Sequence, residues 1–321
     1  MRPDGGGGGV LFVHAHPDDE SMATGGTIAR LVSEGVRVDL VTCTDGAEGE
    51  IHDPSLDPEE ARPRLAGIRA EELACSIAAL GGGAIYHHVL GYRDSGMIGT
   101  DANEHPESFW QADVEEATRR LLEIVRAARP AAIVSYDENG NYGHPDHINA
   151  ARIAREAYDA SAGEPWAMSR FYEIAFVRER WFELMAAMKA RGIALPWNLD
   201  EVVAGDAQRP AADELNPSNA AAMAQVGEAI EAEEGDALGF GRADAEVTTR
   251  VDVTSFLEAK RGSMACHRTQ AQDLGWMLAL PEDLADGAMD TEYFVLRRLD
   301  GAEVPPDHRE TSLLGRSASS T

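Results

Sequence analysis

Over its first half, the chain alternates short apolar runs with segments of helical periodicity, and this rhythm limits the possible folds more than any other feature. Apolar runs of strand length occupy residues 10–13, 37–42, 84–89 and 131–135. Segments with apolar residues at helical spacing occupy residues 24–34, 59–80, 111–128 and 148–158. Strands joined by helix-length crossovers pair in parallel. The rhythm therefore predicts an α/β fold with a Rossmann-like, mostly parallel sheet and helices on both faces.

Polar clusters follow directly after each of these four strands. The stretch His14–Glu20 (HAHPDDE) follows the first strand, and the acidic, glycine-rich loop Asp45–Glu50 follows the second. Asp94 comes after the third strand, and His144–His147 (HPDH) after the fourth. In open parallel sheets, ligands bind outside the carboxyl ends of the strands. We therefore expect all four clusters to meet at one edge of the sheet.

The two His-Pro-Asp motifs have the composition of a catalytic metal site. Catalytic zinc commonly takes three ligands from His and carboxylate side chains and keeps an open position for water. The stretch His16-Pro17-Asp18-Asp19 can supply two ligands and a separate carboxylate base. The third ligand would come from His144–His147, and the residues alone do not say which of its two histidines binds. His14 is expected to support the site.

The amino-acid composition disfavours two classes of binding partner. The chain has 56 acidic and 28 basic residues, a formal net charge of −28, which argues against nucleic acid and anionic membranes as partners. The three cysteines, Cys43, Cys75 and Cys266, are far apart and odd in number, which predicts reduced thiols and a cytoplasmic location. The chain has no CxxC pair, no signal-peptide h-region and no apolar run of membrane-spanning length.

The domain organisation predicted from these patterns has four parts. Residues 1–9 form a flexible glycine-rich tail, and residues 10–177 form the catalytic core with the metal site. Residues 178–300 form a smaller C-terminal lobe that closes the substrate pocket and returns to the sheet. Residues 301–321 are expected to be a disordered tail. The acidic, proline-broken segment 196–242 has no assigned role.

Several stretches together resemble one known family. HAHPDDE and YDENGNYGHPDH (residues 136–147) are similar to the paired motifs of the LmbE-like (PIG-L type) zinc-dependent N-deacetylases. VTCTDGAEGE, GIRAEEL, GYRDSGM and ACHRTQ resemble the actinobacterial mycothiol branch of that family, which includes N-acetylglucosaminyl-inositol deacetylases and mycothiol S-conjugate amidases. The resemblance covers residues 11–159 and resumes over 247–270.

The resemblance implies a role for each residue of the site. His16, Asp19 and His147 would bind one Zn²⁺ per chain, with another divalent metal as the alternative, and Asp18 would be the general base. His144 would act as general acid or polarise the amide oxygen, with Asp146 orienting it. Tyr142 would donate to the tetrahedral oxyanion. The residues expected to contact the substrate are Arg69, Asp94, Met97, Glu48 and His267.

The implied reaction is hydrolysis of an amide, most simply deacetylation of an N-acetylglucosamine-containing small molecule such as N-acetylglucosaminyl-inositol. The alternatives are a mycothiol S-conjugate amidase and a secondary-metabolism paralogue acting on a sugar or thiol adduct. Ala23 stands where the amidases usually have Lys, although YDENG is similar to them as well. A non-catalytic metal- or sugar-binding relative is disfavoured because Asp18 is present. A homo-oligomer is left open. A nucleotide-dependent Rossmann enzyme is disfavoured because no GxGxxG follows the first strand.

Overall fold

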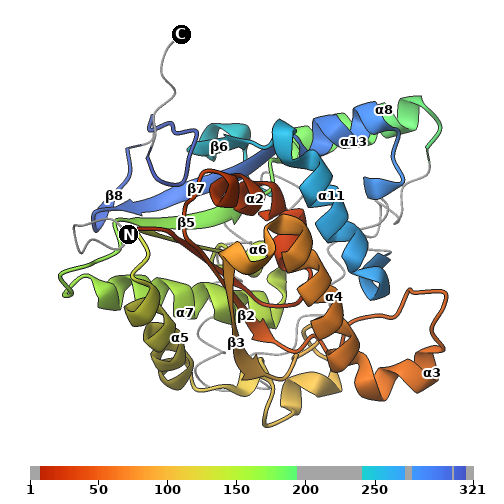
Figure 1. The fold of residues 1–321 in the computed structure, drawn as a ribbon, viewed down its shortest axis with the longest axis horizontal. Coiled ribbons are helices and arrows are strands. Elements are labelled where there is room, and N and C mark those ends of the chain that lie inside the picture. The colour runs from red at the N-terminus through yellow and green to blue at the C-terminus, as the bar shows by residue number, and fades with distance from the viewer. Residues whose placement is uncertain (1–7, 194–240, 272–276, 306, 316–321) are drawn as a thin grey trace.

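The protein is built around one eight-stranded sheet (Figure 1). The structure is a computed structural model and describes residues 8–193, 241–271, 277–305 and 307–315. The strand order is β3-β2-β1-β4-β5-β7-β6, and β8 pairs with β7. The strands are β1 (Val10–His14), β2 (Val38–Thr44), β3 (Ile85–Tyr92), β4 (Ala132–Ser135), β5 (Arg170–Ala175), β6 (Thr249–Asp252), β7 (Thr291–Leu299) and β8 (Ala302–Glu303).

The pairing confirms the predicted fold class. Strands β3, β2, β1, β4 and β5 are all parallel, and only the C-terminal strand β7 runs antiparallel to β5. Every residue of β1, β2 and β4 is buried. Such complete burial is expected where helices cover both faces of a parallel sheet, and it explains why β1 is a continuous apolar run. Strand β2 also buries the polar residues Asp39, Thr42 and Thr44.

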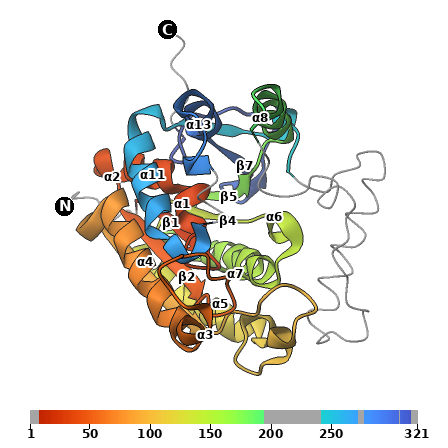
Figure 2. The same cartoon turned by 90° about the vertical axis from the view of Figure 1, so that its right-hand side faces the viewer.

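Helices cover the two faces as two separate groups (Figure 1, Figure 2). On one face, α2 (Gly25–Ser33), α4 (Leu65–Leu80) and α11 (Leu257–Cys266) pack together, and on the other, α5 (Val114–Ala128) packs along α7 (Pro145–Ser161). Short helices α1 (Asp19–Met22), α3 (Pro58–Ala61) and α6 (Gly140–Gly143) interrupt the loops, and α8 (Arg178–Ala190) and α13 (Glu282–Met289) follow β5 and precede β7.

The strand order places a topological switch point between β1 and β4. From β1 the chain moves outward through β2 and β3, then crosses back to add β4 on the other side of β1. Loops that leave two such neighbouring strands diverge and open a crevice at their carboxyl ends. The two His-Pro-Asp motifs are the continuations of these two strands, so the fold brings them together.

The C-terminal part both extends the sheet and forms a small core of its own. Strands β6 and β7 complete the sheet, while α8, α11 and α13 enclose a methionine-rich cluster that includes Met185, Met188, Met264 and Met289. Most of the segment 196–242 lies outside the described residues, as do residues 1–7 of the predicted N-terminal tail. Because β5, before residue 177, pairs with β7, after it, the predicted division at residue 177 runs through one continuous sheet.

The chain after β7 differs from the expected disordered tail. Strand β8 pairs with β7, and Glu310 accepts hydrogen bonds from Arg170 (2.5 Å) and the hydroxyl of Tyr172 (2.6 Å). Leu313 is 1% exposed. These anchors hold residues 301–315 on β5 because a buried carboxylate and a buried leucine both gain from the contact. Residues 316–321 lie outside the described part.

The prediction of three reduced cysteines is wrong. Cys75 within α4 and Cys266 at the end of α11 form a disulfide, with a Cα–Cα distance of 5.7 Å, and Cys43 is free and buried. Nothing in the sequence indicates this pair, since its members are separated by 191 positions and only the contact of α4 with α11 brings them together. The cysteine count therefore no longer supports a cytoplasmic location. Within the described ranges, no helix is long and apolar enough to cross a membrane.

Candidate metal centre and active site

Three side chains from the two His-Pro-Asp motifs converge at the switch point. His16 follows β1, Asp19 opens α1, and His147 lies in the first turn of α7. The His16 Nδ1 to His147 Nε2 distance is 3.3 Å, His16 Nδ1 to Asp19 Oδ2 is 3.6 Å, and His147 Nε2 to Asp19 Oδ1 is 3.4 Å. Ligands placed tetrahedrally at zinc bond lengths stand about 3.3–3.6 Å apart. The donor set and its spacing therefore fit one such cation.

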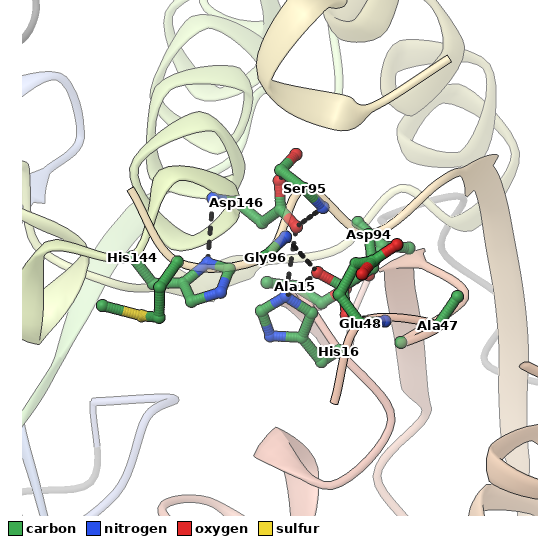
Figure 3. A network of polar contacts seen from close by, with 12 residues as sticks. Ala15, His16, Ala47, Glu48, Asp94, Ser95, Gly96, His144 and Asp146 are labelled. Atoms are coloured by element: carbon green, nitrogen blue, oxygen red, sulfur yellow. Dashed lines mark hydrogen bonds and ion pairs between the residues drawn. The ribbon is translucent and has the colours of Figure 1, made fainter. Parts of the chain in front are cut away.

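Two buried carboxylates contact the ring of His16 and fix its orientation. Its Nε2 lies 3.2 Å from Asp146 Oδ2 and 3.6 Å from Asp94 Oδ1 (Figure 3), whereas its other nitrogen, Nδ1, faces His147. Asp146 is fully buried and also accepts hydrogen bonds from the backbone N–H (2.9 Å) and hydroxyl of Ser95. A carboxylate bonded to the second nitrogen of a ligating histidine fixes its tautomer and ring orientation.

The two adjacent aspartates of the first motif are in different electrostatic states. Burial alone would raise the pKa of Asp19, but His147 and His16 outweigh it and hold that pKa well below its usual range. Burial raises the pKa of Asp18 to about 7, against Arg69, which lowers it, while the neighbouring Asp19 raises it further. Asp19 is therefore a permanent carboxylate suited to a ligand, and Asp18 can take up a proton near neutral pH.

The loop after β4 presents Tyr142 and His144 to the site. Tyr142 is half exposed, and its hydroxyl lies 3.4 Å from His147 Nε2. Asp137 shapes this loop by accepting hydrogen bonds from the backbone N–H groups of Asn139 (3.0 Å) and Asn141 (2.7 Å). Gly140 has a φ of 62°, and a Cβ there would lie 2.6 Å from the His147 Cβ. Only glycine lets the loop lie this close to the start of α7.

His144 is the N-cap residue of α7, and this position sets its tautomer. Its Nδ1 accepts the backbone N–H of Asp146 at 3.2 Å (Figure 3). Burial, together with the adjacent His16 and His147, holds the pKa of His144 well below its usual value. The neutral ring must then carry its proton on Nε2, which is free to donate. His144, His16 and His147 have nitrogens within 4.8 Å of one another, so His144 borders the ligand set.

Asp146 is expected to orient His144, but its side chain contacts other residues. The side chain of Asp146 bonds to His16 and Ser95, and only its backbone N–H bonds to His144. Orientation of His144 by Asp146 is therefore a helix-capping effect, whereas the Asp146 carboxylate acts on the ligand His16.

The residues expected to contact substrate fall into a rim group and a buried group. Met97 is 44% exposed at the rim, and Glu48 beside it is paired with Arg93. Asp94 lies between the rim and His16. Arg69 is 3% exposed and donates to the carbonyl oxygens of Gly46 (2.9 Å) and Pro17 (2.5 Å) and to Asp18 Oδ2 (2.8 Å). Arg69 is thus bonded to Asp18, the residue that the sequence predicts to be the base.

His267 is buried against Glu20 and is not exposed to the predicted substrate pocket. It is 1% exposed, and its Nε2 lies 2.7 Å from Glu20 Oε1. Tyr136, which the sequence did not single out, stacks on the His147 ring at a centroid distance of 4.1 Å and accepts the Ala15 N–H at 2.8 Å. Its place directly after β4, at the same edge as His144, was the only signal that could have identified it.

Sequence comparison finds close relatives along almost the whole chain. A family model described as PIG-L, GlcNAc-PI de-N-acetylase, matches residues 11–158. A 1D-myo-inositol 2-acetamido-2-deoxy-alpha-D-glucopyranoside deacetylase of Thermomonospora curvata is 40% identical over 325 residues, covering 95% of each chain. A protein of the same name from Acidothermus cellulolyticus is 39% identical over 311 residues, covering 95% of this chain and 93% of the relative.

Structural comparison shows how widely this fold is used. The 4-carboxy-2-hydroxymuconate hydratase GalB from Pseudomonas putida aligns with a TM-score of 0.52, covering 90% of this chain and 95% of that chain at 16% identity. At this identity the likeness concerns the fold alone. Because a hydratase and the deacetylases above share it, the reaction has to be argued from the residues of the site.

Proposed function

Because the chain belongs to the PIG-L family of de-N-acetylases, we propose that it is a metal-dependent amidohydrolase that deacetylates an N-acetylglucosamine-containing small molecule, with N-acetylglucosaminyl-inositol as the leading substrate. The observation that carries this proposal is the full set of a ligand triad, a separate carboxylate and a proton-donating imidazole within one crevice. The relatives named for this substrate match across 95% of the chain, so the proposal extends to the whole protein and not only to the motifs.

We propose zinc as the metal, held by His16, Asp19 and His147. Two imidazoles and one carboxylate are a common ligand set of catalytic zinc, which leaves a fourth position for water or substrate. When bound, zinc supplies a Lewis acid that lowers the pKa of water to about 7 and polarises a carbonyl oxygen. The carboxylates of Asp146 and Asp94, on the far nitrogen of His16, support this assignment because they strengthen the imidazole as a ligand.

Asp18 is the proposed general base. It follows the ligand motif directly, and Arg69 fixes one of its carboxylate oxygens at 2.8 Å. A base must be ionised at the working pH yet still accept a proton, and a pKa near neutrality meets both needs. Asp18 takes the proton of the attacking water and, once protonated, can return it to the nitrogen of the departing amine, so that the step balances.

His144 and Tyr142 are the proposed partners of the amide oxygen. The Nε2–H of neutral His144 points away from the α7 backbone and can donate to an oxyanion, and the Tyr142 hydroxyl can donate from the other loop position. Preorganised donors of this kind commonly contribute 10²–10³ in rate. Asp94, Glu48 and Met97 border the crevice and would contact the hydroxyls and apolar face of the sugar. Arg69 would affect substrate only through Asp18 and Pro17.

A direct assay tests the function. Purified protein is incubated with N-acetylglucosaminyl-inositol and, separately, with a mycothiol S-conjugate, and mass spectrometry measures acetate, free amine and cleaved conjugate. We expect acetate release from the first substrate by protein containing about one zinc per chain. Preferential cleavage of the conjugate would reassign the protein as an amidase. Hydrolysis by fully metal-free protein would refute the mechanism.

A further inference from the structure

The backbone of Asp18 has an unusual conformation that something must hold. Its φ of 130° and ψ of −31° lie in a region that residues other than glycine rarely adopt. The Asp18 carbonyl accepts hydrogen bonds from Ser21 N (2.9 Å) and Ser21 Oγ (2.7 Å), which fixes only its C-terminal side. Residues kept in such conformations persist only where their surroundings over-determine them.

The N-terminal side of Asp18 is held by Glu20. The Asp18 backbone N–H donates to Glu20 Oε2 at 3.0 Å, and Glu20 is 1% exposed. A buried carboxylate is stable only if both of its oxygens are well bonded. The position of Glu20 therefore depends on what bonds its second oxygen.

That second oxygen is held by residues from two distant helices. Glu20 Oε1 accepts a hydrogen bond from the hydroxyl of Ser76 on α4, and it lies 2.7 Å from Nε2 of His267, the residue after α11. Ser263 on α11 lies 2.6 Å from the Ser76 hydroxyl and extends the chain of bonds. Ser76 is fully buried and His267 is 1% exposed, so neither is available to solvent or substrate.

We propose that Glu20 is a positioning residue for the general base, and that His267 and Ser76 hold it in place. The inference rests on the proposed function of Asp18. By fixing the peptide N–H of Asp18, Glu20 sets the direction of the Cα–Cβ bond and hence where the carboxylate meets the attacking water. Arg69 then fixes the rotation of that carboxylate. The imidazole of His267 contributes through Glu20 and not through contact with substrate.

The primary test is Glu20→Gln, which keeps the shape but leaves an NH₂ group where an acceptor is needed. We expect kcat to fall by roughly 10²-fold, as for other small misplacements of reacting groups, with KM and zinc content unchanged. Glu292→Gln is the matched control, since Glu292 is another buried carboxylate that accepts backbone N–H groups, those of Gly26 (2.9 Å) and Thr27 (2.7 Å). Equal losses of kcat in the two variants would overturn the proposal.

A pair of variants at His267 gives a second measure if Glu20→Gln does not fold. His267→Gln places an N–H donor where Nε2 lies and should keep kcat near that of the wild type. His267→Leu removes the donor and should reproduce the loss seen for Glu20→Gln, again with KM unchanged. Equal kcat in both His267 variants, or a fall in zinc content that accounts for the loss, would overturn the proposal.

A crystal structure of Glu20→Gln or His267→Leu supplies a readout that does not depend on the substrate. We expect the Asp18 φ to leave the positive region and its carboxylate to move away from Arg69. An unchanged Asp18 backbone would refute the positioning role even if the proposed substrate were wrong. Conversely, a wild-type protein that releases no acetate, combined with a displaced Asp18 in the variant, would refute the function and leave the positioning role standing.

Discussion

Two buried ionic sites of the molecule differ in how completely the protein's own groups satisfy them. At the first, Lys260 Nζ lies 2.7 Å from Glu292 Oε1, and the same carboxylate caps the α2 backbone at Gly26 and Thr27. One cation and two N–H groups meet one carboxylate. At the second, His16, Asp19 and His147 turn their donor atoms toward a common point at mutual distances of 3.3–3.6 Å.

The difference separates a structural ion pair from a site built for a ligand. The Lys260–Glu292 pair brings its own counter-charge and needs nothing further, so its value lies in fixing α11 and β7 around α2. The triad has lone pairs that face one another, an arrangement that a shared cation stabilises strongly and that a folded chain holds only at a cost. The following predictions test this contrast, from the largest expected effect on hydrolysis to the smallest.

Removal of the metal should have the largest effect. Dialysis against a strong zinc chelator should lower kcat by at least about 10³-fold, because a bound Lewis acid contributes several kcal/mol to the transition state. Added zinc should restore the activity, and the far-ultraviolet circular dichroism should stay unchanged throughout. Full activity in protein shown to be metal-free by mass spectrometry would contradict the ligand assignment.

Substitution of the base should lower the rate while the metal stays bound. Asp18→Asn preserves volume and tolerates a positive φ, so the backbone should keep its place. We expect kcat to fall by about 10²–10⁴-fold, the usual contribution of general acid–base catalysis, with zinc content unchanged. If zinc were lost in parallel with activity, Asp18 would be a ligand and the roles within the Asp18-Asp19 pair would have to be revised.

The pH dependence of kcat should respond to Arg69. Asp18 acts as a base only when ionised, so kcat should decline as the pH falls below the pKa of its carboxyl group. The positive charge of Arg69 lowers that pKa, so Arg69→Met should move the acidic limb of the kcat profile to higher pH. Arg69→Lys is the matched control, because it keeps the charge and should keep the limb near its wild-type position. An unmoved limb in Arg69→Met would assign the titration to another group.

The Lys260–Glu292 pair should affect stability and leave catalysis alone. Lys260→Met removes one partner of a buried ion pair and should lower the free energy of unfolding by about 3–5 kcal/mol, measured by urea denaturation. The kcat of the folded fraction should equal that of the wild type. Normal stability together with a reduced kcat in Lys260→Met would contradict the proposed distinction between the two ionic sites.

The fold was predictable because its signals are local. Continuous apolar runs such as Val10–Val13 and the amphipathic pattern of α5 depend on burial of individual segments, and parallel pairing follows from crossover length. The place of the candidate metal site was predictable for the same reason, since the segments that hold His16 and His144–His147 follow two neighbouring strands. The choice of His147 over His144 came from the family resemblance, and the structure adds a reason, the capping bond that occupies His144 Nδ1.

Two of the features that sequence reasoning missed depend on contacts between helices that are distant in the sequence. Nothing local indicates that Ser76 and His267 share the oxygen of Glu20, or that Cys75 bonds to Cys266. Each requires the relative placement of α4 and α11, which are separated in the sequence by residues 81–256. The family resemblance of the ACHRTQ stretch suggested a pocket role for His267, whereas tertiary packing buries its side chain against Glu20.

The bond between Cys75 and Cys266 also changes what a break in the backbone would do. A protease that cuts anywhere between these two residues opens the polypeptide but leaves the N-terminal fragment, with His16 and Asp19, covalently attached to the C-terminal fragment. The nicked protein would migrate as one species without reductant and as two with it. The chain is thus a loop closed between two cysteines 191 positions apart, with two free arms, and fragments produced inside the loop stay together as partners for reassembly.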